Sequence, residues 1–209
     1  MMTLELLKSE IEANVPGCLL EIILNPSPSG QHSLLIDPEH ALAIAEFLRD
    51  AAHLRFDYCS NVTGIDWPAP KLSGKVKLKE MEDGMEQDGE EEIEAHATGH
   101  LEAVYHLYSM EKKHGPVILR MRTEDRAKRI HLPSLTSVWR STDFQEREIF
   151  DLYGIIFDGH PDLRRILMWD EFEDHPMRRD YREPDDYEYE PTAHDEVLRK
   201  TREHHSITA

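Results

Sequence analysis

The carboxylates, arginines and histidines that follow Glu146 are the residues of this chain most densely placed for chemistry. They lie in the run EREIFDLYG and, a few residues later, in GHPDLRRIL. Paired carboxylates can perform general acid–base catalysis, and paired arginines can hold a phosphate or a carboxylate. Glu146 and Glu148, however, are two positions apart on a predicted helix, so they point to different sides and cannot face one substrate. Their spacing therefore excludes a shared carboxylate site.

Two His-Pro turns, each followed by an arginine pair, are the second candidate for chemistry. The first is HPDLRR, with His160, Pro161, Arg164 and Arg165, and the second is HPMRR, with Arg178 and Arg179. Guanidinium groups match carboxylates, phosphates or backbone carbonyls, so the turns suggest two arms that reach across a surface. Coincidental turns remain an alternative. A second alternative is an independent enzyme that uses His160, Asp162 and the arginines on a phosphorylated substrate.

Other catalytic and metal-binding patterns are weak or missing in the sequence. It contains no GxSxG, HExxH, P-loop or GxGxxG motif. His96 and His100 have the i,i+4 spacing of helical metal ligands, but they flank Gly99 beside a polar insert. Lone histidines are more often structural than ligating, so we expect no metal site and no catalytic residue in this chain.

The charged run is predicted to form a helix that something covers. Asp143 is the predicted N-cap, Glu146 completes a capping box and Gly154 supplies a left-handed stop. Asp143, Arg147 and Asp151 follow at i, i+4 and i+8, so one arginine lies between two carboxylates on one face. Such charges among large apolar residues tolerate burial only if each finds a partner. We therefore interpret the run as a docking face, with ordinary surface ion pairs as the alternative.

The preceding sequence predicts an α+β fold with a mixed or antiparallel sheet covered by helices. A motif helix and an extended C-terminal arm should follow the sheet. Asp37-Pro38 is a strong helix start, with Asp at the N-cap and Pro at the first helical position. Helices are expected at 4–14, from 37 to 52 and from Pro133 to Trp139, and strands at 18–24, 32–36, 55–66, 100–109 and 116–122.

Composition divides the chain into three parts. Residues 1–132 form the α+β domain, which carries an acidic insertion at 68–99; residues 133–181 form the motif segment; and 182–209 form a polar tail. The insertion has too little apolar surface to order itself, so we expect it to be mobile. An acidic docking site for a basic partner is the alternative. The tail is expected to be either disordered or an extended arm on a neighbouring protein.

Charge and cysteine content exclude several classes of protein. The 209 residues include 42 acidic and 24 basic residues, and the formal net charge of −18 disfavours nucleic acids and anionic membranes as partners. Two distant cysteines cannot build a disulfide framework or ligate an iron–sulfur cluster. No apolar run has the length of a membrane span, and the amino end lacks signal-peptide features. We expect a cytosolic protein of bacterial origin.

The pattern ERExxDLYGxxFxGHPDLRRIL, with Trp139 upstream and HPMRRDY downstream, resembles the thirty-kilodalton subunit family of respiratory complex I, also called the C subunit. That complex is the proton-pumping NADH:quinone oxidoreductase. The resemblance spans 133–181, and it continues more weakly over 38–52 and 54–66, which include the run TGID. It implies a structural and assembly subunit of the peripheral arm with no cofactor of its own, because partner subunits carry FMN, iron–sulfur clusters and quinone.

The resemblance also implies a location and partners. The chain would lie at the cytoplasmic face of the bacterial inner membrane and contact the membrane only through the complex. It would dock against the quinone-site subunit, of the forty-nine-kilodalton type, and against the cluster-bearing subunit beside it. The residues carried over as interface or structural positions are Glu146, Arg147, Glu148, Asp151, Gly154, His160, Pro161, Arg164, Arg165, Arg178 and Arg179. An equivalent subunit of a membrane-bound hydrogenase, or of a ferredoxin- or F420-linked NDH-1 complex, remains the alternative.

Three features depart from the family pattern. The insertion is longer than the expected hairpin connection, Thr142-Asp143-Phe144 replaces a small residue and Trp, and Arg182-Glu183 follows where a proline is common. The first two departures leave the expected fold intact. The third puts the path of the C-terminal arm in doubt.

Overall fold

The central element of the fold is a mixed five-stranded sheet. The computed structural model describes residues 3–69, 72–82, 85–95 and 99–182, and between 72 and 95 it describes the backbone alone. The strand order is β1-β2-β7-β6-β3, with β2 and β7 parallel and all other neighbours antiparallel. The prediction of an α+β fold with a mixed sheet is thus confirmed. The strands are β1 (Leu20–Ile23), β2 (Ser33–Ile36), β3 (Tyr58–Trp67), β6 (His100–Ser109) and β7 (His114–Arg122).

Two helices before β3 begin at capping residues that the local sequence supplies. Helix α1 (Leu4–Asn14) has the predicted bounds, and the Thr3 hydroxyl accepts a hydrogen bond from the Leu6 amide. Asp37 caps the 3₁₀ helix η1 (Pro38–His40), which leads directly into α2 (Ala41–Asp50). Its carboxylate also accepts from the Leu19 amide at 2.7 Å, so the same residue joins this helix start to the beginning of β1.

The two faces of the sheet have different neighbours. In β6, Leu101, Ala103, Tyr105 and Leu107 are fully buried and share one core with residues of α1, α2 and the motif segment. Glu102 and the other alternate residues of β6 lie on the opposite face. No described helix contributes to that second face, so the sheet is covered by helices on one side within the described residues.

The motif segment starts with a strand where a helix was predicted. Strand β8 (His131–Pro133) pairs in parallel with β9 (Ile156–Asp158), and the Ser134 amide continues this ladder to the Asp158 carbonyl at 2.8 Å. A turn and the 3₁₀ helix η2 (Arg140–Thr142) follow. The predicted helix from Pro133 to Trp139 is therefore wrong, because long-range pairing with β9 holds its first residues extended.

The acidic insertion joins two strands that pair with each other. Trp67 at the end of β3 lies opposite His100 at the start of β6. Between them β4 (Leu72–Glu82) and β5 (Met85–Ala95) form a two-stranded antiparallel sheet, where composition predicted no regular structure. The expected mobility of the insertion stays a prediction.

The chain divides after Arg179. Residues up to Arg179 form one compact unit, in which the motif segment shares the core of the sheet, and Asp180–Ala209 form a second. Only Asp180–Arg182 of the second unit are described. The expectations for the polar tail lie outside the described residues.

The motif segment as candidate functional site

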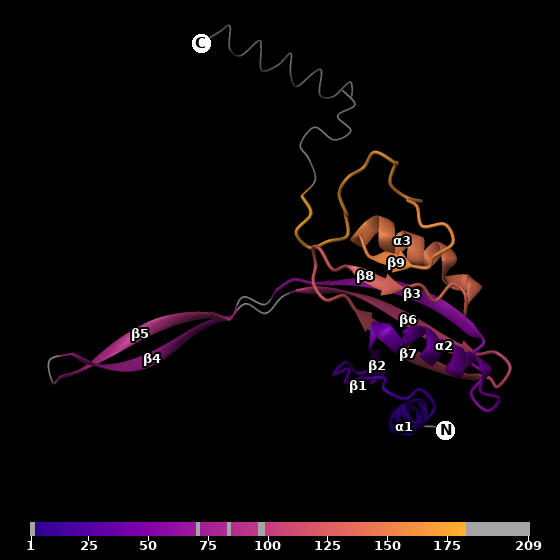
Figure 1. The fold of residues 1–209 in the computed structure, drawn as a ribbon, viewed down its shortest axis with the longest axis horizontal. Coiled ribbons are helices and arrows are strands. Elements are labelled where there is room, and N and C mark those ends of the chain that lie inside the picture. The colour runs from indigo at the N-terminus through magenta and orange to yellow at the C-terminus, as the bar shows by residue number, and fades with distance from the viewer. Residues whose placement is uncertain (1–2, 70–71, 83–84, 96–98, 183–209) are drawn as a thin grey trace, which may run out of the picture. The chain divides into compact units, whose positions relative to one another are not determined.

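Helix α3 (Asp143–Tyr153) positions the motif, and glycines at two places allow its close packing. It lies along β3 (Figure 1). A Cβ on Gly64 of β3 would come 2.5 Å from the Tyr153 ring. Gly154 ends the helix with a φ of 79°, which confirms the predicted left-handed stop. A Cβ on Gly154 would also collide with the side chains of His175 and Arg178.

Glu146 is fully buried and is bound by the segment before the helix. Its carboxylate accepts hydrogen bonds from the Leu135 amide at 2.9 Å and from the hydroxyls of Ser134, Thr136 and Tyr105. Burial raises the pKa of Glu146, and the hydrogen bonds only partly offset this effect. The predicted capping box is wrong: Thr142 is the N-cap and makes no side-chain cap bond, because four long-range donors engage the Glu146 carboxylate instead.

Arg147 lies nearly buried between α3 and the loop that follows β9. Its Nη1 is 3.5 Å from a carboxylate oxygen of Asp162, and its Nε donates to the Arg164 carbonyl at 3.3 Å. The guanidinium also lies over the Phe144 ring, 5.2 Å from its centre. Every partner except Phe144 belongs to the loop, so Arg147 fastens the loop to the helix.

Asp151 is fully buried and organises the turn after the first arginine pair. Its carboxylate accepts hydrogen bonds from the backbone amides of residues 166, 167 and 168 at 3.0, 2.7 and 2.9 Å. Arg165 donates to the same carboxylate at 2.7 Å. Burial opposes ionisation of Asp151, but these donors outweigh it and hold the pKa of the carboxyl below its ordinary value.

The predicted ladder of ion pairs along α3 is wrong. Among the described residues, Arg147 pairs with Asp162 and Asp151 with Arg165, while the His160 ring lies 3.7 Å from the Asp143 carboxylate. All three partners come from the loop. A buried charge gains more from such partners than from an i,i+4 neighbour, whose exposed ion pair contributes only about 0.3–0.5 kcal/mol.

The first His-Pro turn folds back onto the start of α3. The buried His160 side chain donates from Nε2 to the Asp143 carbonyl at 3.1 Å, and its Nδ1 accepts from the Asp162 amide at 3.1 Å. Arg164 donates to the Asp162 carboxylate at 3.0 Å. Because both ring nitrogens are engaged, this geometry does not favour the alternative of an enzyme that uses His160 on a phosphorylated substrate.

The second His-Pro turn folds back onto the end of α3. Arg178 donates from Nε to the Tyr153 carbonyl at 2.7 Å, and His175 bonds the Asp151 carbonyl at 3.0 Å. Within the described residues the two turns thus hold the ends of one helix, rather than reaching across a surface as predicted. Of the predicted site residues, the ones that lie exposed are Glu148, Pro161, Arg164 and Arg179.

Several residues that support this site were not singled out from the sequence. Asp66 receives two 2.6 Å hydrogen bonds from Arg126 and one from the Arg179 amide at 2.8 Å. Tyr105 and Ser134 bind Glu146 from other elements. The run TGID, which holds both Gly64 and Asp66, was the one available signal. The partners of Asp66 are 60 and 113 residues away, so local spacing could not reveal them.

Comparison with known proteins decides the family. Residues 34–188 match the profile described as the 30 Kd subunit of the respiratory-chain NADH dehydrogenase. The chain belongs to this family. A family relative from Salinispora tropica, named as the C subunit of NADH-quinone oxidoreductase, is 38% identical over 73% of this chain and 50% of its own length. A relative of the same name from Roseiflexus castenholzii is 32% identical, with 80% of each protein covered.

The first relatives within this subunit family are longer than this chain, which spans about half their length. Among solved structures, a chain from the membrane-bound sulfane sulfur reductase, an archaeal respiratory membrane complex, has a TM-score of 0.54 at 18% identity. The match covers 95% of this chain and 91% of the other, and it shows a shared fold. Within the described residues, none of the helices is long and apolar enough to cross a membrane.

Proposed function

We propose that this chain is a non-catalytic structural and assembly subunit in the peripheral arm of a proton-pumping NADH:quinone oxidoreductase. The names of its relatives support the complex, and the use of the motif charges supports the role. Residues of the same chain engage Glu146, Arg147 and Asp151, and this supports a role as a scaffold rather than as a reactive centre. FMN, iron–sulfur clusters and quinone would be held by the partner subunits.

The observation that carries this proposal is a set of exposed apolar side chains on the scaffold. Four large side chains of α3 and the following loop are well exposed: Phe144 (66%), Leu167 (57%), Trp169 (43%) and Met177 (53%). We call these four residues the motif surface. The Asp151 carboxylate fixes the backbone at Leu167, and the Met177 amide bonds the Leu152 carbonyl at 3.1 Å. Large apolar side chains on an ordered backbone are typical of protein docking sites.

The proposed partners are the quinone-site subunit and the cluster-bearing subunit of the complex. Glu148, Arg164 and Arg179 have exposed positions from which they can pair with a partner, whereas the buried charges hold the loop. The chain would lie at the cytoplasmic face of the bacterial inner membrane and meet the membrane only through the complex.

A related assembly is the second candidate. The fold shared with a chain of an archaeal respiratory membrane complex supports this second candidate, because one fold can serve complexes with different electron donors. Membrane-bound hydrogenases and ferredoxin- or F420-linked NDH-1 complexes are the assemblies meant. Mass spectrometry of the complex that co-purifies with the tagged chain discriminates them: flavin-bearing NADH-input subunits support the first candidate, and nickel-site subunits support the hydrogenase.

Charge substitutions on the motif surface test the docking role. We expect Trp169→Glu and Met177→Glu each to lower co-purification of the quinone-site subunit at least tenfold, because each places a charge in an apolar contact. The matched controls are Leu6→Glu and Met110→Glu, which alter comparably exposed apolar residues elsewhere. Circular dichroism checks that all four variants fold. Full recovery of the quinone-site subunit with both motif-surface variants would contradict the proposal.

A further inference from the structure

The face of the sheet opposite the helices contains a hollow of about 590 Å³. Residues of all five strands line it, together with residues of the loop that follows β1. Much of the lining is apolar, from Leu24, Ile65, Trp67, Val104 and Ile118. Leu24 and Trp67 remain well exposed, and no described helix packs on this face. We call this surface the open face.

A buried carboxylate and two arginines lie in the middle of the open face. Glu102 is fully buried, and its carboxylate accepts hydrogen bonds from Arg120 Nε at 3.0 Å, from Arg122 Nε and from Trp67 Nε1 at 2.9 Å. His100 also contacts this carboxylate, at 3.3 Å. One carboxylate thus holds two guanidinium groups in place, which leaves one positive charge in excess on a chain whose net charge is −18.

Two polar side chains of the open face lack some of their hydrogen-bond partners within the described residues. The Arg122 side chain is 36% exposed, and its terminal nitrogens make no hydrogen bond within the described part of the chain. His106 lines the same hollow, and its buried Nδ1 has no hydrogen-bond partner there. Buried polar atoms are nearly always satisfied, so an orphan in a hollow indicates a surface that something else completes.

Arg122 also connects the open face to the free edge of β1. It lines a second hollow of about 330 Å³ together with Leu19, Leu35 and the acidic residues Glu21 and Asp37, and Leu19 is one of the most exposed apolar residues of the chain. Apolar side chains therefore lie on both sides of the Arg122 guanidinium, and in the second hollow two acidic residues lie among them. An extended surface of this kind fits a polypeptide segment better than a small molecule.

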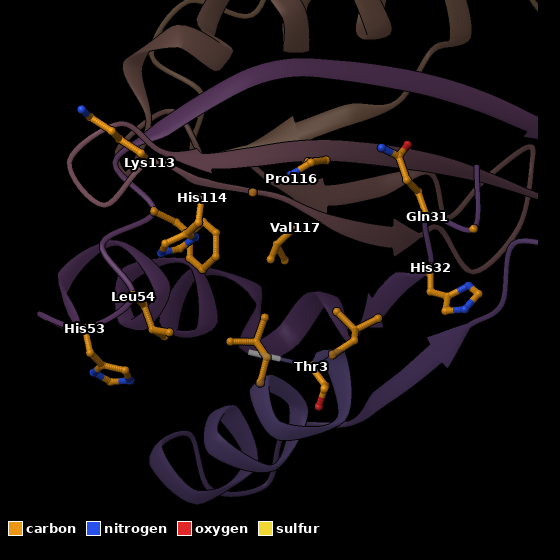
Figure 2. A pocket seen from close by; sticks show the side chains of 14 residues that line it. Thr3, Gln31, His32, His53, Leu54, Lys113, His114, Pro116 and Val117 are labelled. Carbon is orange, nitrogen blue, oxygen red and sulfur yellow. The ribbon is translucent and has the colours of Figure 1, made fainter. Parts of the chain in front are cut away.

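A further hollow lies between α1 and the beginning of β7. Its volume is about 720 Å³ and its walls include Leu7, Leu54 and Val117 (Figure 2). In Figure 2 the Lys113 side chain extends away from it, and His53 pairs with Glu10. Nothing in that hollow selects one occupant, in contrast to the arginines of the open face.

We propose that the open face docks an acidic segment of another subunit of the same complex. A carboxylate of that segment pairs with the free end of the Arg122 guanidinium, and its apolar neighbours fill the hollow beside Ile65 and Ile118. The fork of a guanidinium matches a carboxylate, and the positive excess complements it. The inference rests on the proposed function, because the partner belongs to that complex, but it concerns a surface separate from the motif surface.

Site-specific cross-linking in the intact complex tests this inference. A photo-crosslinking amino acid is placed at Leu24, which is exposed and outside the Glu102 cluster, and the irradiated complex is purified and digested. We expect an adduct with a different subunit, on a peptide that carries Asp or Glu within a few residues of the linkage. The same amino acid at Leu6, comparably exposed on α1, should not give this adduct.

Variants of Arg122 test the charge. Arg122→Gln keeps a donor for Glu102 but removes the positive charge, so we expect the yield of the adduct to fall at least fivefold. Arg122→Lys keeps the charge and should lower the yield by no more than about twofold. Replacing the identified acidic residue of the partner by lysine should likewise lower the yield when this chain carries wild-type Arg122. Combining that lysine with Arg122→Glu in this chain should restore the yield.

The outcomes separate this inference from the proposed function. An adduct only with lipid, with a second copy of this chain or with a peptide that lacks acidic residues would overturn it. An unchanged yield with Arg122→Gln would overturn it as well. In both cases the chain would still co-purify with the complex, and the proposed function would stand. A chain absent from the purified complex would overturn the proposed function, and this inference with it.

Discussion

At the scale of single residues, two buried carboxylates of α3 are held in opposite ways. Burial dominates at Glu146 and raises its pKa, because its partners are one amide and three neutral hydroxyls. At Asp151 three amides and an arginine outweigh burial and lower the pKa. Both carboxylates nevertheless have the same structural role, since each holds a neighbouring segment of the chain against α3.

Replacing Glu146 by the neutral glutamine should benefit stability more at high pH than at low pH. A carboxyl with a raised folded-state pKa contributes stability that is complete below its ordinary pKa of 4.5 and is lost as pH rises through the raised value. Relative to the wild type, Glu146→Gln should therefore gain in free energy of unfolding as pH rises from 4 to 7. Glu146→Ala should lose about 3 kcal/mol at pH 7, because it leaves buried donors unsatisfied. Urea unfolding at both pH values measures these differences, and a relative loss for Glu146→Gln on raising the pH would contradict the assignment.

Asp151 should show the opposite dependence on pH. Its folded-state pKa is lowered, so its contribution is present above the ordinary value of 3.8 and is lost as pH falls through the lowered one. We expect Asp151→Asn to lower the free energy of unfolding at pH 7 by about 3–5 kcal/mol, because it removes one partner of a buried ion pair. Faster amide exchange at residues 166–168 would locate the damage. Asp50→Asn, at an exposed carboxylate paired with the adjacent Arg49, is the control and should change stability by less than about 1 kcal/mol.

At the scale of elements, the contact between α3 and β3 depends on the absence of a side chain at Gly64. The Tyr153 ring occupies the space that a Cβ would need. This contact places the buried face of α3 over the sheet, where Tyr105 of β6 reaches Glu146 at 3.1 Å. Packing of the motif helix and satisfaction of its charges are therefore parts of one arrangement.

Overpacking of this contact should be reversible by a second substitution. We expect Gly64→Ala to lower the free energy of unfolding by about 1–3 kcal/mol, since the ring must move. Combining it with Tyr153→Ala should cost less than the sum of the two single changes, because the collision is then absent. Chemical denaturation of the four proteins completes the cycle. Strict additivity would show that the two residues do not compete for this space.

At the scale of the whole molecule, one compact unit contains the sheet, its helices and the motif segment as far as Arg179, and the acidic insertion lies in the sequence between two paired strands. Trp67 and His100 lie opposite each other, so the strands meet without help from the insertion between them. Two surfaces of this unit are suited to contact: the motif surface beside α3 and the open face of the sheet. Their separate positions would let one subunit join two neighbours.

Removal of the insertion should leave the sheet intact. Replacing residues 68–99 with Asn-Gly, which favours a two-residue hairpin turn, should change the free energy of unfolding by less than about 1 kcal/mol. If the insertion is mobile as predicted, the backbone amide hydrogens of β4 and β5 should exchange with solvent faster than those of β6 in the full chain. Loss of cooperative unfolding in the shortened protein, or slow exchange throughout β4 and β5, would contradict this organisation.

The sequence by itself determined the elements with strong local signals and the family. Asp37-Pro38 began a helix, Gly154 ended one, and the strands that form β6 and β7 followed from apolar patterning. These features depend on capping, glycine geometry and side-chain alternation, which act over a few residues. The motif EREIFDLYG also indicated that its charges needed cover.

Only the tertiary structure decided what that cover is. The partners of the three motif charges are not their helical neighbours. Glu146 binds a residue 41 positions away in the sequence, Arg147 one 17 positions away and Asp151 one 15 positions away. Spacing along one helix predicts i,i+4 pairs, but a buried charge must replace its lost hydration with several donors or acceptors at once. A folded loop and an adjacent sheet can supply such a set, and one helix face cannot. For the same reason, the Glu102 cluster became visible only when β3, β6 and β7 lay side by side.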